Sequence, residues 1–272
     1  MRAAALVAFG PAELKEGANG GTMGSPVPRP HGFQPCALPA ELPRPGPQCG
    51  DTTVPNTASF TTNTTGATGS SSANVLVHVV CKQNTGALTK GFWGNKNGQA
   101  IISSGYATSG VCNSATWLRQ YAPFQDLSSK ATCAGVAAYA AGVFDGANSS
   151  GSSMNQMLKA QMLATALDVY FSNAALGGNK INAPAPIGGL TIDLTNVCAV
   201  IPSNPPGTCS GTFVDARSAF GGATNLTVGQ MLAAAAAASN SGGSTWYGNV
   251  KSTQELAKDA FDAINNGVAF LV

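Results

Sequence analysis

The chain has 272 residues, of which 44% are hydrophobic and only 10% are charged, and its net charge at pH 7 is +2. In globular proteins about a quarter of the residues are usually charged. With far fewer charged residues here, Ser, Thr, Asn and Gly supply most of the polar surface. The small net charge and the lack of a Lys/Arg cluster exclude a nucleic-acid-binding footprint, and the uncharged polar composition is typical of secreted bacterial proteins.

Residues 1–50 have the composition of an extended or disordered arm. They contain nine of the sixteen prolines and show no apolar periodicity. The first ten residues, MRAAALVAFG, combine one basic residue with a short apolar run, but no clear signal-peptide cleavage site comes after it. The run is also too short to span a membrane. We therefore expect the natural sequence to extend upstream of Met1.

Residues 51–84 predict a β-hairpin. TTVPNTASFTT and SSSANVLVHVV are strand-like runs around NTTGATG, and their β-branched residues favour strands. The pair resembles the last two strands of the Ig-like repeats of bacterial surface proteins. Because two strands are marginally stable alone, we expect the hairpin to pack on the domain C-terminal to it or to end a β-sandwich.

Residues 85–272 predict one mostly α-helical domain. Three helices are expected to open with an S/T-x-x-E/Q capping box, in which two side chains satisfy each other's backbone donors. These boxes are Ser153 with Gln156, Thr227 with Gln230, and Ser252 with Glu255. The first box precedes a helix over 154–174 that places six residues on one apolar face: Met154, Leu158, Met162, Ala166, Val169 and Tyr170.

Further elements complete this domain. The helix that begins after Ser252 is expected to end at Asn266-Gly267, a suitable C-cap. SATWLRQYA and CAGVAAYAAGVF predict weaker helices, and GGLTIDLTNVCAV predicts a strand or hairpin arm. The predicted fold class is α+β: a disordered Pro-rich arm, a β-hairpin, and a mostly helical domain stapled by disulfides.

The stretch from Thr89 to Gly98, TKGFWGNKNG, carries a resemblance to a known family. Together with MLKAQMLATALDVYF and AFDAINNG, it resembles an uncharacterised C-terminal module of bacterial secreted and surface proteins. That family has the form T-x-G-[FY]-W-K-N-H, then helices of the LLAAQLNVA type, then a helix with N-N-G. The resemblance covers roughly 85–272 and implies secretion or surface display, with no settled activity.

This chain departs from the family pattern at two positions. Lys96 stands where many members have histidine, and Gly94 stands where they have lysine. A metal or acid/base role for that histidine therefore does not transfer, and we expect no metal and no cofactor.

Seven cysteines predict disulfides and hence an oxidising compartment. They form no C-x-x-C pair, and no histidine completes a zinc set. Cys198 and Cys209 bracket a Pro-rich loop that a disulfide would close, and Cys112 with Cys133 forms a comparable pair. The remaining cysteines are Cys36, Cys49 and Cys81, and their connectivity stays open. Because their number is odd, one of these three thiols is unpaired or forms a disulfide with another chain.

The TKGFWGNKNG stretch has two readings. Its glycines lack the spacing of a phosphate-binding loop, and no Gly-Lys-Ser/Thr ends it. In one reading, exposed aromatic and polar side chains grip a sugar ring; the candidate ligand-binding residues are Phe92, Trp93, Asn95, Lys96, Trp117 and Trp246. In the other, which we favour, Trp93 anchors the first helix to the core and Asn97-Gly98 forms a turn.

The inventory of side chains argues against an enzyme. The only histidines, His31 and His78, lie in the arm and in a predicted strand, and no G-x-S-x-G occurs. A glycosidase needs two carboxylates, whereas the aspartates here are scattered and are expected to serve as caps or turn residues: Asp126, Asp145, Asp168, Asp193 and Asp215. For Asp168, within the best predicted helix, we expect solvent exposure.

These observations favour an extracellular, non-enzymatic structural or adhesive module of the cell surface. Its partners would be copies of itself or other surface proteins, with a filament or matrix subunit as one form. The extended arm or the hairpin edge would then add a strand to a neighbouring subunit. The alternative is a carbohydrate-binding module that uses exposed Trp and Phe side chains to bind polysaccharide.

Overall fold

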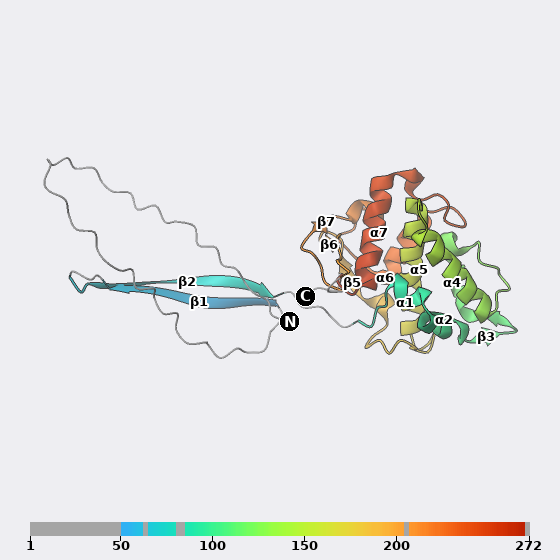
Figure 1. The fold of residues 1–272 in the computed structure, drawn as a ribbon, viewed down its shortest axis with the longest axis horizontal. Coiled ribbons are helices and arrows are strands. Elements are labelled where there is room, and N and C mark those ends of the chain that lie inside the picture. The colour runs from blue at the N-terminus through green and yellow to red at the C-terminus, as the bar shows by residue number, and fades with distance from the viewer. Residues whose placement is uncertain (1–49, 62–64, 80–84, 204–206, 270–272) are drawn as a thin grey trace. The chain divides into compact units, whose positions relative to one another are not determined.

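Two twelve-residue antiparallel strands, β1 (Gly50–Thr61) and β2 (Thr68–Val79), form the first element of the computed structural model. The structure describes residues 50–61, 65–79, 85–203 and 207–269 (Figure 1). The predicted hairpin is therefore confirmed. The predicted boundary between 51–84 and 85–272 adjoins residues 80–84, outside the described residues, and the predicted arm over 1–50 lies almost entirely outside them.

The described residues from 85 onward form a mainly helical domain with three short antiparallel strand pairs, which confirms an α+β class. The α-helices are α1 (Lys90–Gly94), α2 (Lys96–Ser103), α3 (Asn113–Leu118), α4 (Cys133–Asn148), α5 (Met154–Ser172), α6 (Val228–Ala237) and α7 (Lys251–Asn265). The strand pairs are β3 (Ala107–Thr108) with β4 (Val111–Cys112), β5 (Thr191–Asp193) with β8 (Asn225–Thr227), and β6 (Val197–Cys198) with β7 (Phe213–Val214). The single-turn 3₁₀ helices are η1 (Ala122–Phe124), η2 (Ile187–Gly189), η3 (Arg217–Phe220) and η4 (Tyr247–Asn249).

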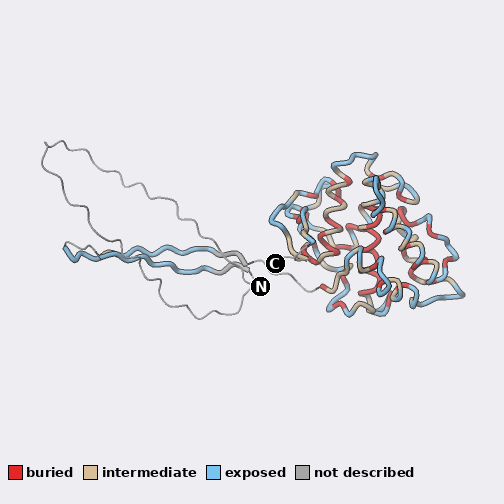
Figure 2. Tube along the Cα trace, viewed as in Figure 1, coloured by how far each residue is buried: buried red, intermediate tan, exposed pale blue. Residues whose placement is uncertain are grey.

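Helix α5 is the centre of this domain, and it packs against α4, α7 and α1 (Figures 1 and 2). Fourteen of its nineteen residues are buried, including the polar Thr165 and Asp168. The prediction of a single apolar face is therefore too narrow. A helix that is buried on all sides has no solvent-facing stripe, and the small alanines at 160, 164 and 166 allow neighbours to approach closely.

A buried polar contact joins α5 to α7. The Thr165 hydroxyl donates to the Asn265 carboxamide oxygen at 2.7 Å, and the Asn265 amide donates to the backbone and side-chain oxygens of Gln161 at 3.0 and 2.8 Å. Asn265 is 1% exposed. Because buried amides need partners, the first asparagine of the N-N-G sequence fixes how α7 lies on α5.

Two of the three predicted capping boxes are present in the structure. The boxes of Ser153 with Gln156 and of Thr227 with Gln230 are confirmed, with each side chain bonded to the other's backbone. The box at Ser252 is wrong: α7 begins at Lys251, and Val250 precedes it without a side-chain cap. An ion pair of Lys251 with Glu255, 3.6 Å apart, engages the glutamate that the box required.

The C-terminal end of α7 matches the prediction. Asn266 is the C-cap residue, and Gly267 comes next with φ of 67°, a left-handed conformation that glycine adopts without steric cost. The segment GGLTIDLTNVCAV contributes two very short strands, β5 and β6, which pair with different partners.

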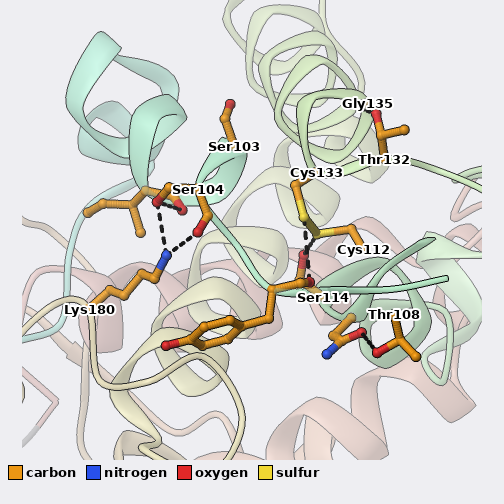
Figure 3. Close-up of a disulfide and its surroundings, with 12 residues drawn as sticks. Ser103, Ser104, Thr108, Cys112, Ser114, Thr132, Cys133, Gly135 and Lys180 are labelled. Atoms are coloured by element: carbon orange, nitrogen blue, oxygen red, sulfur yellow. Dashed lines mark hydrogen bonds between the residues drawn. A yellow bond between two sulfur atoms is a disulfide. The ribbon is translucent and has the colours of Figure 1, made fainter. Parts of the chain in front are cut away.

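Two disulfides close loops of this domain, and both predicted pairings are confirmed. Cys112 bonds Cys133 over a separation of 21 residues, and Cys198 bonds Cys209 over a separation of 11. The first ties β4 to the start of α4 (Figure 3). The remaining cysteines lie outside the described residues, so their predicted pairing is not addressed: Cys36, Cys49 and Cys81.

The Cys112–Cys133 disulfide is expected to make a measurable contribution to the free energy of unfolding. Closing a loop of this length lowers the conformational entropy of the unfolded chain by an amount worth about 3 kcal/mol. We therefore expect the Cys112→Ala/Cys133→Ala variant to lose about that much free energy of unfolding in a urea titration. The same titration of wild type in reductant should show at least this loss. An unchanged midpoint in the double variant would contradict a structural role for the bond.

Candidate functional site

The TKGFWGNKNG stretch folds into two short helices that are capped by its own side chains. The Thr89 hydroxyl accepts from the Phe92 backbone N–H at 3.2 Å at the start of α1. The Asn95 side chain accepts from the backbone N–H groups of Asn97 and Gly98 at the start of α2. Asn97 and Gly98 therefore belong to the first turn of α2, and the prediction that they form a separate turn is wrong.

Gly98 lets the two helices meet. A Cβ atom there would lie 2.4 Å from the Phe92 carbonyl oxygen and 2.5 Å from the Trp93 Cα. Such contacts are far below van der Waals distance, and both partners are backbone atoms. The glycine is therefore required by close backbone approach, not by phosphate binding.

Trp93 is fully buried and lies against α5. Its indole N–H donates to the Asp168 Oδ1 atom at 3.0 Å, and its ring stacks on Phe171 with centroids 5.6 Å apart. The favoured reading of Trp93 as a core anchor agrees with this placement. With no exposed face, the side chain cannot contribute to a sugar-binding platform.

Asp168 corrects a prediction, because it is fully buried and not solvent-exposed. Its Oδ1 atom accepts from the Leu88 backbone N–H and from Trp93, each at 3.0 Å, while Oδ2 has no partner among the described residues. Burial raises the pKa of Asp168 well above its usual range, and the two hydrogen bonds oppose that rise. The carboxyl therefore lies within the core, where it has no contact with solvent.

The remaining predicted ligand residues near Trp93 do not form a site either. Phe92 is half-buried, and its ring packs edge-to-face with that of Trp93, with ring centroids 5.7 Å apart. The Asn95 side chain is engaged as a helix cap, and the Lys96 side chain is exposed.

Trp246 is also an anchor. It is fully buried, and its indole N–H donates to the Gly243 carbonyl at 2.9 Å. The Gln254 amide donates to the Trp246 carbonyl at 3.0 Å and to the Asn155 carboxamide oxygen at 2.8 Å. These bonds tie the segment between α6 and α7 to α5, so Trp246 is not available to a ligand.

Trp117 alone among the three tryptophans remains partly exposed, and it borders a groove of about 680 Å³. Its ring centroid lies 5.2 Å from the ring centroid of Tyr121 and 5.4 Å from that of Tyr170. The groove lies between the β3–β4 hairpin, α3 and the end of α5. It is lined by Thr108, Ser109, Val111, Asn113, Thr116, Trp117, Gln120, Ser129, Tyr170, Ala175 and Leu176.

Two of the predicted turn aspartates have that role. Asp193 accepts from the Thr195 backbone N–H at 2.8 Å, and Asp215 accepts from that of Arg217 at 3.0 Å. The Arg217 side chain also bonds Asp215 and lowers the pKa of that carboxyl to about 2. Asp145 is exposed on α4.

Asp126 is not a cap but part of a charged cluster. Its carboxylate lies 2.6 Å from Lys159 Nζ and accepts from the Tyr139 hydroxyl at 2.7 Å. Lys159 Nζ also donates to the Gly242 carbonyl at 2.8 Å. All of these groups are paired with one another, so the cluster links α4, α5 and two loops.

Asp262 on α7 is a partly buried carboxyl that the sequence pattern did not indicate. It accepts from the Gln161 and Asn266 side chains, and burial raises its pKa while the nearby Lys258 opposes the rise. Asp259 is close in sequence and is ion-paired with Lys258 at 2.6 Å. Neither carboxylate lines the groove beside Trp117. Within the described residues, no group of three or more His, Cys, Asp or Glu side chains could hold a metal ion.

No family model, no curated protein and no solved structure matches the chain. The resemblance to the GFW/GYW module therefore stays a prediction. Across the described segments, no helix is both long and apolar enough to cross a bilayer.

The Asp168 contact predicts a pH-dependent stability. With its raised pKa, folded Asp168 keeps a proton that the unfolded chain releases above about pH 4, so its contribution falls as the pH rises toward the folded-state pKa. Asp168→Asn keeps an oxygen acceptor but cannot titrate. We expect the free energy of unfolding of this variant, relative to wild type, to increase from about pH 4 to about pH 8 in urea titrations.

The matched variant Asp168→Ala leaves the N–H groups of Leu88 and Trp93 buried without an acceptor, so we expect a loss of about 2–5 kcal/mol. If the free energies of unfolding of wild type and Asp168→Asn changed with pH in parallel, the pKa of Asp168 would not be raised in the folded state, and the prediction would be contradicted.

Proposed function

We propose that the chain is an extracellular, non-enzymatic structural or adhesive module that associates with copies of itself through the β1–β2 ribbon. The observation that carries this proposal is the exposure of the ribbon: among its residues with described side chains, none is buried (Figure 2). An isolated two-stranded ribbon is marginally stable in water, so an additional packing partner would stabilise it.

The two faces of the ribbon differ in chemistry. The register pairs Val54 with Val75 and Phe60 with Gly69, which places these residues on one face. Ala58 and Ala73 lie on the same face, as do the polar residues Asn56 and Ser71. The Phe60 ring covers the space where Gly69 lacks a side chain. We call this surface the apolar face; Val54, Phe60 and Val75 are 39%, 63% and 47% exposed on it.

The opposite face is mostly hydroxylated. The hydroxyls of Thr57 and Ser72 lie 2.9 Å apart there, and further Thr and Ser side chains continue the row. Leu76 is the large apolar exception, with 66% exposure. Hydroxyl groups can remain solvated, whereas the apolar face gains free energy when it leaves water.

A second copy of this chain is the partner that fits this surface. None of the side chains described on the ribbon, those of residues 53–61 and 68–76, is charged, so this part of the ribbon offers no complement to an acidic or basic partner. Two identical apolar faces match each other across a two-fold axis without charge repulsion. Among the described residues, no further strand pairs with β1 or β2, and open strand edges also favour association between sheets.

The location and the non-enzymatic role rest on separate support. Disulfides persist in oxidising compartments, and this domain contains two of them. The described aspartates are occupied in turns, ion pairs or the core, or lie apart on the surface. We therefore propose a role that depends on binding and assembly.

Charge placed on the apolar face tests the association. In sedimentation velocity, we expect the wild-type chain to associate with rising concentration and Phe60→Lys to weaken this association at least about tenfold, because a lysine on the contact face must be desolvated. Thr57→Lys is the matched control, with equal charge on the hydroxylated face, and should associate more strongly than Phe60→Lys. A wild-type monomer at high concentration, or equal association of both variants, would overturn the proposal.

A further inference from the structure

The groove beside Trp117 has the chemistry of a site for a neutral polar ligand. No charged side chain lines it, and seven of its lining residues carry a hydroxyl or carboxamide: Thr108, Ser109, Asn113, Thr116, Gln120, Ser129 and Tyr170. An anionic or cationic ligand would find no counter-charge there, and a purely apolar ligand would bury these polar groups without partners.

Aromatic groups form part of the same groove. Trp117 offers a partly exposed ring, and its indole N–H has no hydrogen-bond partner among the described residues. Tyr170 lies beside it, and the Tyr170 hydroxyl is buried without a partner in the described part of the chain. A tryptophan ring presents an apolar face and a polar edge, which suits a molecule with both C–H faces and hydroxyl groups.

The wall of the groove is held in place before any ligand binds. The Cys112–Cys133 bond fixes β4, which contains the lining residue Val111 and directly precedes Asn113. The Thr108 hydroxyl donates to Asn113 Oδ1 at 2.8 Å (Figure 3). A preorganised wall loses less conformational entropy on binding. The volume of about 680 Å³ also falls within the range of small-molecule sites.

We propose that this groove binds sugar units of a neutral polysaccharide, with Trp117 stacking on a sugar ring and the surrounding hydroxyl and amide groups bonding its hydroxyls. Of the tryptophans predicted from sequence to bind carbohydrate, namely Trp93, Trp117 and Trp246, this proposal keeps only Trp117. This binding does not depend on association through the ribbon, which is far from these residues in sequence.

Affinity electrophoresis of the full chain tests the proposal. The gels contain soluble β-glucan, α-glucan, mannan or xylan, with polygalacturonate as the anionic comparison. We expect retardation by at least one neutral polymer and none by polygalacturonate. The same polymer should change tryptophan fluorescence, because Trp117 is the partly exposed tryptophan.

Three variants assign the binding to the groove. Trp117→Ala removes the ring, and Thr116→Arg places a long side chain into the groove from an exposed position on α3, so we expect each to weaken binding at least about tenfold. Ala100→Arg adds the same side chain on the exposed surface of α2 and should bind like wild type. Near-UV circular dichroism verifies folding, and Thr116→Arg remains decisive if Trp117→Ala does not fold.

The outcomes separate this proposal from the association of copies. Phe60→Lys should keep its polysaccharide binding even if it no longer associates. No retardation by any neutral polymer, retardation by polygalacturonate alone, or undiminished binding by Thr116→Arg would overturn the groove as a neutral-sugar site.

Discussion

The hydrogen bonds of one buried carboxyl hold the start of the helical domain to its centre. Asp168 on α5 accepts from the backbone of Leu88 and from the indole of Trp93, residues 80 and 75 positions away in the chain. A buried carboxyl without donors would be strongly destabilising, and a buried indole N–H needs an acceptor. Each group therefore requires the other, which fixes where α1 lies on α5.

The three sequence segments from which the resemblance to a secreted module is predicted converge on this helix. GFWGNKNG reaches it through Trp93 and Asp168, and AFDAINNG reaches it through Asn265 and Gln161. The middle segment, MLKAQMLATALDVYF, is α5 itself. The first and last of these motifs therefore pack on the middle one, and all three contribute to the core of the domain. Surfaces that could recognise a partner lie elsewhere, on the ribbon and beside Trp117.

Features set by neighbouring residues could be predicted from the sequence. The capping boxes at Ser153 and Thr227 depend on side chains three residues apart, and the glycine after α7 follows from the conformational freedom of that residue. The hairpin joins two strands that are adjacent in the chain, and the two disulfides close short loops. The predicted start of α7 is wrong because the Glu255 side chain forms an ion pair with Lys251 and does not accept from the backbone of Ser252. The burial of Asp168 was missed because its donors lie far away in sequence. The groove combines residues from 108 to 176, and no local pattern indicates that they meet.

Hydrogen exchange of the three indole N–H groups, followed by ¹⁵N-edited NMR and assigned with Trp→Phe variants, tests the central claim that the aromatic motif is an internal anchor. Trp93 and Trp246 donate buried hydrogen bonds to Asp168 and Gly243, whereas Trp117 has no such bond within the described residues. We expect strong protection of the Trp93 and Trp246 signals and rapid exchange at Trp117. Exchange at Trp93 as rapid as at Trp117 would contradict an anchoring role for this tryptophan.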